Sequence, residues 1–187
     1  MRTLAIAQST NALNYAIFDG VYLDTYGVIK YYSVKELYDI IMKLLEEHII
    51  TYVVVNQIDY VKMKHRKDAF DLIKFRTTVK LACAIFNHDD GDFFLEIATS
   101  GWEQYLFGDR IQGVKLAKEK IRIVNQIYQT KLKYDTKHIE TQGQHLADAI
   151  VLGQSYSQGR LNHIRKGVYS IWAKEKSKAI KTDWLAY

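Results

Sequence analysis

The segment QHLADAIVLGQSY, residues 144–156, carries the side chains with the clearest chemical potential in this chain. Its pattern predicts a short amphipathic helix over 143–157, in which His145 and Asp148 stand three residues apart. Side chains at positions i and i+3 share one helix face, so the imidazole and the carboxylate can converge on a metal ion or a phosphate. An ordinary structural role is the alternative, because an acidic residue in the first turn complements the helix dipole.

Three strands are expected before any helix begins. Residues 3–7, 13–19 and 21–32 have strand composition, and Asn11 and the Asp19-Gly20 pair between them are turn signals, so we predict an antiparallel meander. Residues 49–55, IITYVVV, form a β-branched run typical of a central strand buried on both faces. Residues 92–98, DFFLEIA, predict a fifth strand.

Helices are expected between and after these strands. Ser33 followed by Glu36 has the spacing of a capping box, and the apolar periodicity that follows predicts a helix ending near His48. A long helix is predicted from about 67 to 87. The remaining helices that the pattern predicts span residues 99–107, 111–130, 143–157 and 167–180.

Composition indicates an ordinary globular protein of one domain. The chain has 187 residues, of which 48% are hydrophobic and 25% charged. Its lone cysteine, Cys83, cannot form an internal disulfide, which favours a reducing compartment. No apolar run has the length of a membrane span and the first residues lack a signal pattern. We therefore expect a cytoplasmic protein with no membrane partner, in the host cytoplasm if a phage encodes it.

Positive charge is concentrated in three parts of the chain. The formal net charge is +5, and basic residues gather within 62–67, 115–122 and 160–181. Clusters of this kind can form one face that follows a phosphate backbone, which favours nucleic acid as the partner. The alternative is a set of solvated helix faces, and for the Lys-rich tail the sequence leaves both open.

Three segments resemble the RuvC family of Holliday-junction resolvases: LAIAQSTNALNYAIFDG, VVVNQIDYVKMKHRKDAF and QHLADAIVLGQSY. The resemblance covers residues 3–157 and is strongest in HLADAI, then in NQI. It implies an α/β fold of the RNase H-like type, with a five-stranded mixed sheet of three antiparallel leading strands and two parallel strands, flanked by helices. Residues 1–158 would form this domain, and residues 159–187 a basic C-terminal extension of it.

The resemblance also implies a site for two Mg²⁺ ions, or Mn²⁺, at one end of the sheet. In the family, an Asp after the first strand, a Glu after the fourth and two residues of the last helix hold the metals that cleave a phosphodiester. Gln8, Asn56, His145 and Asp148 fall at these positions. Because Gln8 and Asn56 are neutral amides, we expect weak metal binding and impaired catalysis.

Two hypotheses on function follow from this resemblance. The first is a Mg²⁺-dependent crossover junction endodeoxyribonuclease, cutting branched DNA such as four-way junctions or forks, with this chain inactivated at Gln8 and Asn56. The alternative is a non-catalytic protein that binds branched DNA on the same fold. A local slip of the alignment that lets Asp19 or Asp59 supply a carboxylate is a lesser option. An ATPase of the actin type is disfavoured because Gly-rich phosphate loops are absent. Whether the amides are natural or engineered stays open, and a bacteriophage source is weakly indicated.

Relatives in the family act as two-fold symmetric dimers, and a homodimer is expected here. The long helix is the candidate interface through Phe70, Ile73, Phe75, Val79, Ala82 and Phe86. In relatives, the loop after the fourth strand and a basic helix contact DNA, where aromatic rings stack and cations meet phosphates. For Tyr60 plain packing is an equal alternative. The DNA-binding residues implied here are Tyr60, Lys62, Lys64, His65, Arg66, Arg110, Lys115 and Lys118.

Overall fold

The computed structural model places the strands in one mixed sheet of order β3-β2-β1-β4-β5. It describes residues 1–9, 12–57, 66–87, 93–98, 113–135 and 143–157. β1 pairs antiparallel with β2, and β2 with β3, while β4 runs parallel to β1 and β5 parallel to β4. The predicted α/β, RNase H-like sheet is therefore confirmed. The strands are β1 (Arg2–Gln8), β2 (Ala12–Asp19), β3 (Tyr22–Lys30), β4 (Tyr52–Gln57) and β5 (Phe94–Ala98).

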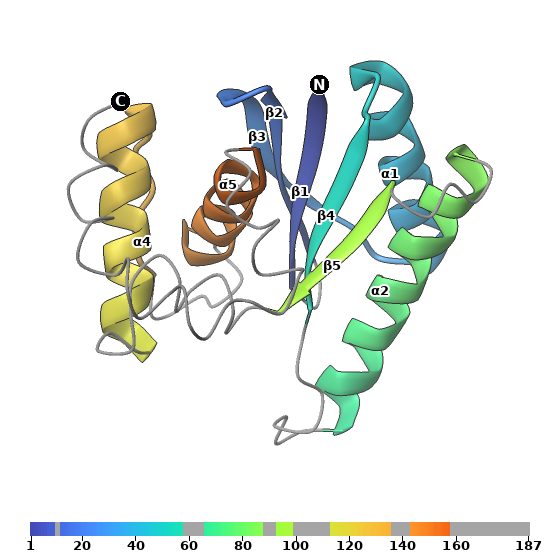
Figure 1. Ribbon diagram of the computed structural model, residues 1–187. Helices are drawn as coiled ribbons and strands as arrows, with labels where there is room; N and C mark the ends of the chain where they lie inside the picture. Colours follow the sequence, from blue (N-terminus) through green and yellow to red (C-terminus); the bar gives the residue numbers. More distant parts are fainter. Residues whose placement is uncertain (10–11, 58–65, 88–92, 99–112, 136–142, 158–187) are drawn as a thin grey trace, which may run out of the picture.

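Helices cover both faces of this sheet (Figure 1). α1 and α2 lie on one face, α5 lies on the other, and α4 packs on the outer side of α5. Two apolar clusters result, one between the sheet and α1 and α2, the other between the sheet and α5 and α4. None of the described helices combines the length and apolar character that a membrane span requires. The helices are α1 (Val34–His48), α2 (Arg66–Phe86), α4 (Gly113–Tyr128) and α5 (Gly143–Ser157).

The start of α1 follows the predicted capping pattern. The Ser33 hydroxyl accepts a hydrogen bond from the Glu36 backbone N–H at 3.1 Å, and the Glu36 carboxylate accepts one from the Tyr32 N–H at 2.8 Å. At the other end, the prediction of a strand from residue 49 is corrected. Ile49 has φ 50°, and its N–H donates to the Leu45 carbonyl, so this residue closes α1 and β4 starts only at residue 52.

α5 lies unusually close to the sheet because Gly153 has no side chain. A Cβ at Gly153 would stand 2.4 Å from a ring carbon of Phe18 and 2.9 Å from the Cβ of Ala5. Farther along the helix, the ring of Tyr156 lies near that of Tyr52 at the start of β4, with 5.9 Å between centroids. α5 therefore runs opposite to β1, and its first turns lie toward the carboxyl ends of β1 and β4.

The predicted dimer face of α2 is partly wrong. Phe75, Val79 and Ala82 are at most 1% exposed and belong to the core against α1 and the sheet. Phe86 packs on the same core and stacks near Phe93. Of the predicted residues, Phe70 and Ile73 do lie on the outer side of α2. Together with two residues that were not predicted, they form an apolar set with 44–58% exposure, which we call the α2 outer stripe: Phe70, Ile73, Leu81 and Ile85.

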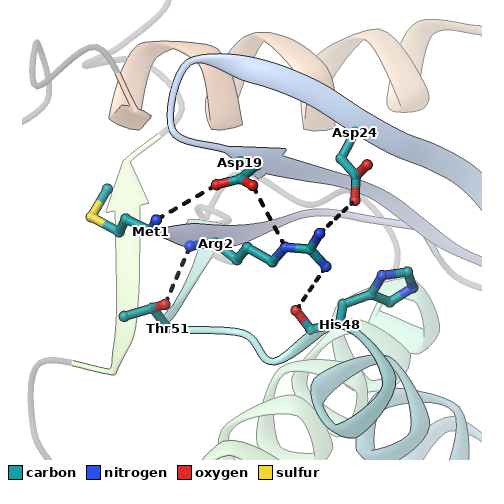
Figure 2. A network of polar contacts seen from close by, with 6 residues as sticks. All are labelled: Met1, Arg2, Asp19, Asp24, His48 and Thr51. Carbon is teal, nitrogen blue, oxygen red and sulfur yellow. Dashed lines mark hydrogen bonds and ion pairs between the residues drawn. The ribbon is translucent and has the colours of Figure 1, made fainter.

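The amino end of β1 is held by a polar network (Figure 2). The Arg2 guanidinium lies between the carboxylates of Asp19 and Asp24, at 4.0 and 3.7 Å, and donates to the His48 carbonyl at 3.2 Å. The Arg2 backbone N–H donates to the Thr51 hydroxyl. Because Asp19 is engaged at this end of the sheet, it does not supply a carboxylate at the carboxyl end. Asp59 lies outside the described residues.

Candidate functional site at the carboxyl end of the sheet

Two asparagines flank Ala7 on the face of the sheet that α5 covers. Ala7 pairs with Asn14 of β2, and the parallel register that aligns Ile6 with Val55 sets Ala7 beside Asn56 of β4. Ala7 is 1% exposed and packs in the cluster beneath α5, and both asparagines are buried. The Asn14 amide donates weakly to the Ser9 hydroxyl at 3.4 Å, while its Oδ1 has no hydrogen-bond partner in the part of the chain that the structure describes. The sheet therefore presents amides and a methyl group here.

Gln8 belongs to the opposite face. It pairs with Leu13, which packs in the cluster against α1 and α2, and residues directly opposite each other in a sheet share a face. Gln8 is 7% exposed, and its Oε1 finds no partner among the described residues. The register therefore moves the candidate position at the end of β1 from Gln8 to Ala7, whose methyl group cannot bind a metal.

Asp148 of α5 is paired with a lysine of the neighbouring helix. The Nζ of Lys120, in α4, donates to Oδ1 of Asp148. The Lys120 side chain is 6% exposed and that of Asp148 is 18% exposed, so the pair is largely removed from water. Lys120 lies beside Ile121 and near Val124 on the buried side of α4, which packs against α5. Asp148 thus forms a largely buried ion pair with Lys120.

His145 stands one turn before Asp148, as predicted. Its Nδ1 lies 3.9 Å from Oδ2 of Asp148, beyond hydrogen-bond distance. Burial lowers the pKa of His145, the Asp148 carboxylate raises it, and the Lys120 ammonium lowers it, with the lowering effects prevailing. The imidazole is therefore neutral at pH 7, and the carboxylate has Lys120 as its charged partner.

These residues do not fit a pair of divalent ions. Hard cations such as Mg²⁺ require several oxygen ligands with negative charge, and two cations require more. The described part of this site offers one carboxylate, and Lys120 already neutralises it. Among the described residues, no group of three His, Cys, Asp or Glu side chains is placed to hold a metal.

The predicted DNA-binding residues are only partly described. Lys115 and Lys118 are exposed on α4, and the Lys118 ammonium lies 5.6 Å from the centre of the Tyr134 ring. Arg66 is the first residue of α2. The others, Tyr60, Lys62, Lys64, His65 and Arg110, lie outside the described residues.

Lys120 is the site residue that the sequence analysis missed. It was counted only as one of the basic residues in 115–122 that could follow a phosphate backbone. The helical period contains the missing signal, because Ala117, Ile121 and Val124 stand three before, one after and four after Lys120 on the apolar stripe of α4. A lysine on such a stripe requires a buried anion as its partner.

Comparisons with known proteins define the class of fold. No family model matches the chain, and no curated protein matches it. Among solved structures, Thermus thermophilus RuvC matches with a TM-score of 0.61 and 16% identity, over 87% of this chain and 97% of that chain. The yeast mitochondrial Holliday junction resolvase matches with 0.55 and 12%, over 92% and 83%. Fowlpox virus resolvase, solved with its substrate Holliday junction DNA, matches with 0.53 and 14%, over 86% and 99%.

The fold of this chain is therefore that of the RuvC-like Holliday junction resolvases, within the RNase H-like class. The match spans most of both chains in each comparison. At 12–16% identity the likeness establishes the architecture, and the chemistry has to be argued from the residues of this chain.

Proposed function

We propose that this protein binds branched DNA, of the four-way junction type, and does not cleave it. The single observation that carries the proposal is the Lys120–Asp148 ion pair at the carboxyl end of a resolvase-type sheet. The fold supports branched DNA as the partner, because the T. thermophilus and fowlpox relatives were solved bound to Holliday junctions. Ala7, Asn56 and the neutralised Asp148 support the absence of hydrolysis, since a two-metal mechanism needs charged oxygen ligands.

Positive charge supports the binding half of the proposal. The chain carries a formal charge of +5, and Lys115 and Lys118 are exposed on α4. Contacts between lysines and phosphates release counterions, so the affinity should fall steeply with salt. The measurement is a gel shift of a labelled four-way junction against a duplex of the same sequence at low and moderate salt. Preference for the junction is expected, and no shift of the junction at low salt would overturn the proposal.

The catalytic half is tested with Mg²⁺ or Mn²⁺ and variants that restore the carboxylates. We expect no nicking of the junction by the natural chain. The combination Ala7→Asp, Asn56→Glu and Lys120→Met places acids on the face under α5 and frees Asp148, so nicking is expected from it. The matched control replaces Ala7→Asp by Gln8→Asp, which adds the same charge to the opposite face and should stay inactive. Nicking by the natural chain would instead favour the active endonuclease.

A two-fold dimer through the α2 outer stripe is also proposed. Four apolar side chains that are 44–58% exposed on one helix are unusual for a surface without a partner. Two copies could pair these helices in an isologous contact, as a junction with two equivalent strands would require. Leu81→Asp should shift the sedimentation profile to the monomer. Val34→Asp, at a residue of α1 with 52% exposure against 53% for Leu81, is the matched control and should leave the dimer intact.

A further inference from the structure

The amino end of the sheet, opposite the candidate site, presents large apolar side chains to solvent. They come from three segments that the Arg2 network holds together: the residue before β1, the turn between β2 and β3, and the residue after α1 (Figure 2). Large apolar side chains gathered on a surface usually mark a contact with a partner. We call this set, whose members are 44–80% exposed, the amino-end surface: Met1, Val21, Tyr22 and Ile49.

Ile49 is placed unfavourably in both its backbone and its side chain. Its φ of 50° lies in the left-handed region, which glycine adopts readily and a β-branched residue adopts only at a cost. Its side chain is 80% exposed, so packing against the described residues does not offset that cost. An isoleucine that strains the backbone and faces solvent points to a role in binding.

Exposed carboxylates accompany these apolar side chains. Asp19 and Asp24 lie 4.0 and 3.7 Å from the Arg2 guanidinium, and Asp19 lies 3.6 Å from the ammonium group of Met1. All three distances are beyond hydrogen-bond distance, so the carboxylate oxygens keep the capacity to accept hydrogen bonds from other cations. Glu46 is exposed on the last turn of α1, and its carboxylate has no ion-pair partner among the described residues. The amino-end surface therefore fits a partner that is both basic and apolar.

The segment after α5, residues 158–187, has this composition and lies outside the described residues. It holds seven basic and two acidic side chains, whereas residues 1–157 contain 19 of each sign, so the segment accounts for the whole formal net charge of +5. Between its basic residues stands the largely apolar run VYSIW, residues 168–172. The lysines and arginines could meet the carboxylates while the apolar run covers the apolar side chains.

The end of α5 brings this segment to the same end of the sheet. The ring centroids of Tyr156 and Tyr52 lie 5.9 Å apart, and Tyr52 pairs with Thr3, the neighbour of Arg2. A random coil of the segment's 30 residues spans about 30 Å on average. Five strands side by side span only about 20 Å. The segment is therefore long enough to reach the amino-end surface of its own chain.

We propose that residues 158–187 dock on the amino-end surface of their own chain. The inference goes beyond the proposed function, because it concerns the end of the sheet opposite the candidate site. Attachment to the same chain favours the contact even where each interaction is weak, since the effective concentration of the segment is high. Docking holds the net positive charge of the chain against exposed carboxylates. The cations available to DNA are then those of other elements, such as Lys115 and Lys118 of α4.

The first experiment couples lysines to carboxylates in contact with them, using a water-soluble carbodiimide, and maps the products by mass spectrometry. In the natural chain, lysines of the segment should link to Asp19, Asp24 or Glu46. Ile49→Gly removes the most exposed apolar side chain and suits the left-handed backbone, so it should fold and lower the yield of these links about fivefold or more. Gln129→Gly is the matched control, because Gln129 follows α4, is exposed and has φ 53°. Its yield should match that of the natural chain within about twofold.

Three results of this experiment would overturn the proposal. The first is the absence of any link between the segment and these carboxylates in the natural chain. The second is an equal yield in Ile49→Gly and Gln129→Gly. The third is a set of links that joins only an isotope-labelled chain to an unlabelled one, which would assign the segment to a second copy.

A second variant covers the case in which Ile49→Gly alters the end of α1. Tyr22→Ser removes a side chain with 77% exposure from the turn on the other side of Arg2, so it should leave the fold intact. Trypsin should cleave after the lysines of the segment about fivefold faster in this variant than in the natural chain, because docking shields them. Equal cleavage rates, with protection of the segment only when a four-way junction is added, would mean that the segment binds DNA and would overturn the proposal.

Discussion

The two ends of the central sheet both carry ion pairs, but water reaches only one of them freely. At the amino end of β1, Arg2 contacts Asp19 and Asp24, and these side chains are 35–59% exposed (Figure 2). At the carboxyl end, the side chains of Lys120 and Asp148 are 6% and 18% exposed. Solvent screens the ion pairs of Arg2 but screens the Lys120–Asp148 pair much less. Ion pairs of the same kind therefore differ in how much they contribute to stability. The burial of the ion pair, more than the number of ion pairs, therefore indicates that the carboxyl end of the sheet is the candidate functional site.

The largest expected effect is on stability when the buried pair is broken. Lys120→Met leaves the Asp148 carboxylate unpaired in a partly buried position, so the free energy of unfolding should fall by about 3 kcal/mol. Lys118→Met is the matched control, because this lysine is exposed two residues earlier on the same helix, and it should cost less than about 1 kcal/mol. Urea unfolding measures both. Equal losses of unfolding free energy in the two variants would contradict a larger contribution of the buried Lys120 to stability.

Removing both charges of the buried pair should recover most of that loss. In Lys120→Met combined with Asp148→Asn, no unpaired charge remains, so about 2 kcal/mol of the deficit should return. The same unfolding measurement, analysed as a double-mutant cycle, gives the coupling between the two residues. A coupling near zero would contradict a direct ion pair.

A smaller effect is expected at the exposed end of the sheet. Arg2→Met removes a guanidinium that solvent already screens, so the loss should stay below about 1 kcal/mol. In about 1 M NaCl the difference between this variant and the natural chain should shrink further, because the screening length falls to about 3 Å. Lys120→Met should keep its deficit in the same salt. A loss at Arg2 as large as that at Lys120 would break the comparison between the two ends.

The smallest effect is that of Arg2→Met on the reactivity of the Cys83 thiol, which lies in α2 within the core on the α1 side of the sheet. Burial raises the pKa of Cys83 to about 12, so little thiolate exists at pH 8 and alkylation of the folded chain should be at least about a hundredfold slower than in denaturant. Arg2→Met should leave this rate unchanged within about twofold. The rate of iodoacetamide labelling, followed by mass spectrometry, checks this. Rapid labelling of the natural chain would contradict a buried thiol.

Much of the fold could be predicted because its signals are local. The capping residues Ser33 and Glu36 mark the start of α1, and the β-branched run that includes Val53 marks the strand buried on both faces. The helix over 143–157 was predicted with the bounds that α5 has. The start of β4 was less well predicted, since the left-handed conformation of Ile49 depends on how α1 ends and not on β propensity.

The candidate site was harder to predict than the fold. His145 and Asp148 were found because one helix carries both, and their spacing alone sets them on one face. Gln8 was predicted from the resemblance, which set it at the position of the family's first Asp. The sheet pairs Gln8 with Leu13 and Ala7 with Asn14, which puts the alanine and not the glutamine beneath α5.

By itself, then, the sequence determined the elements, their order and a helix that bears a carboxylate, because capping, periodicity and β-branching act over a few residues. Only the tertiary structure decided which face of β1 meets α5 and that Lys120, which lies 28 residues before Asp148, neutralises it. The physical reason is that burial and ion pairing are properties of packed neighbours. In the sequence alone, a lysine is expected to face solvent. Here α5 packs over Lys120 and supplies the carboxylate of Asp148.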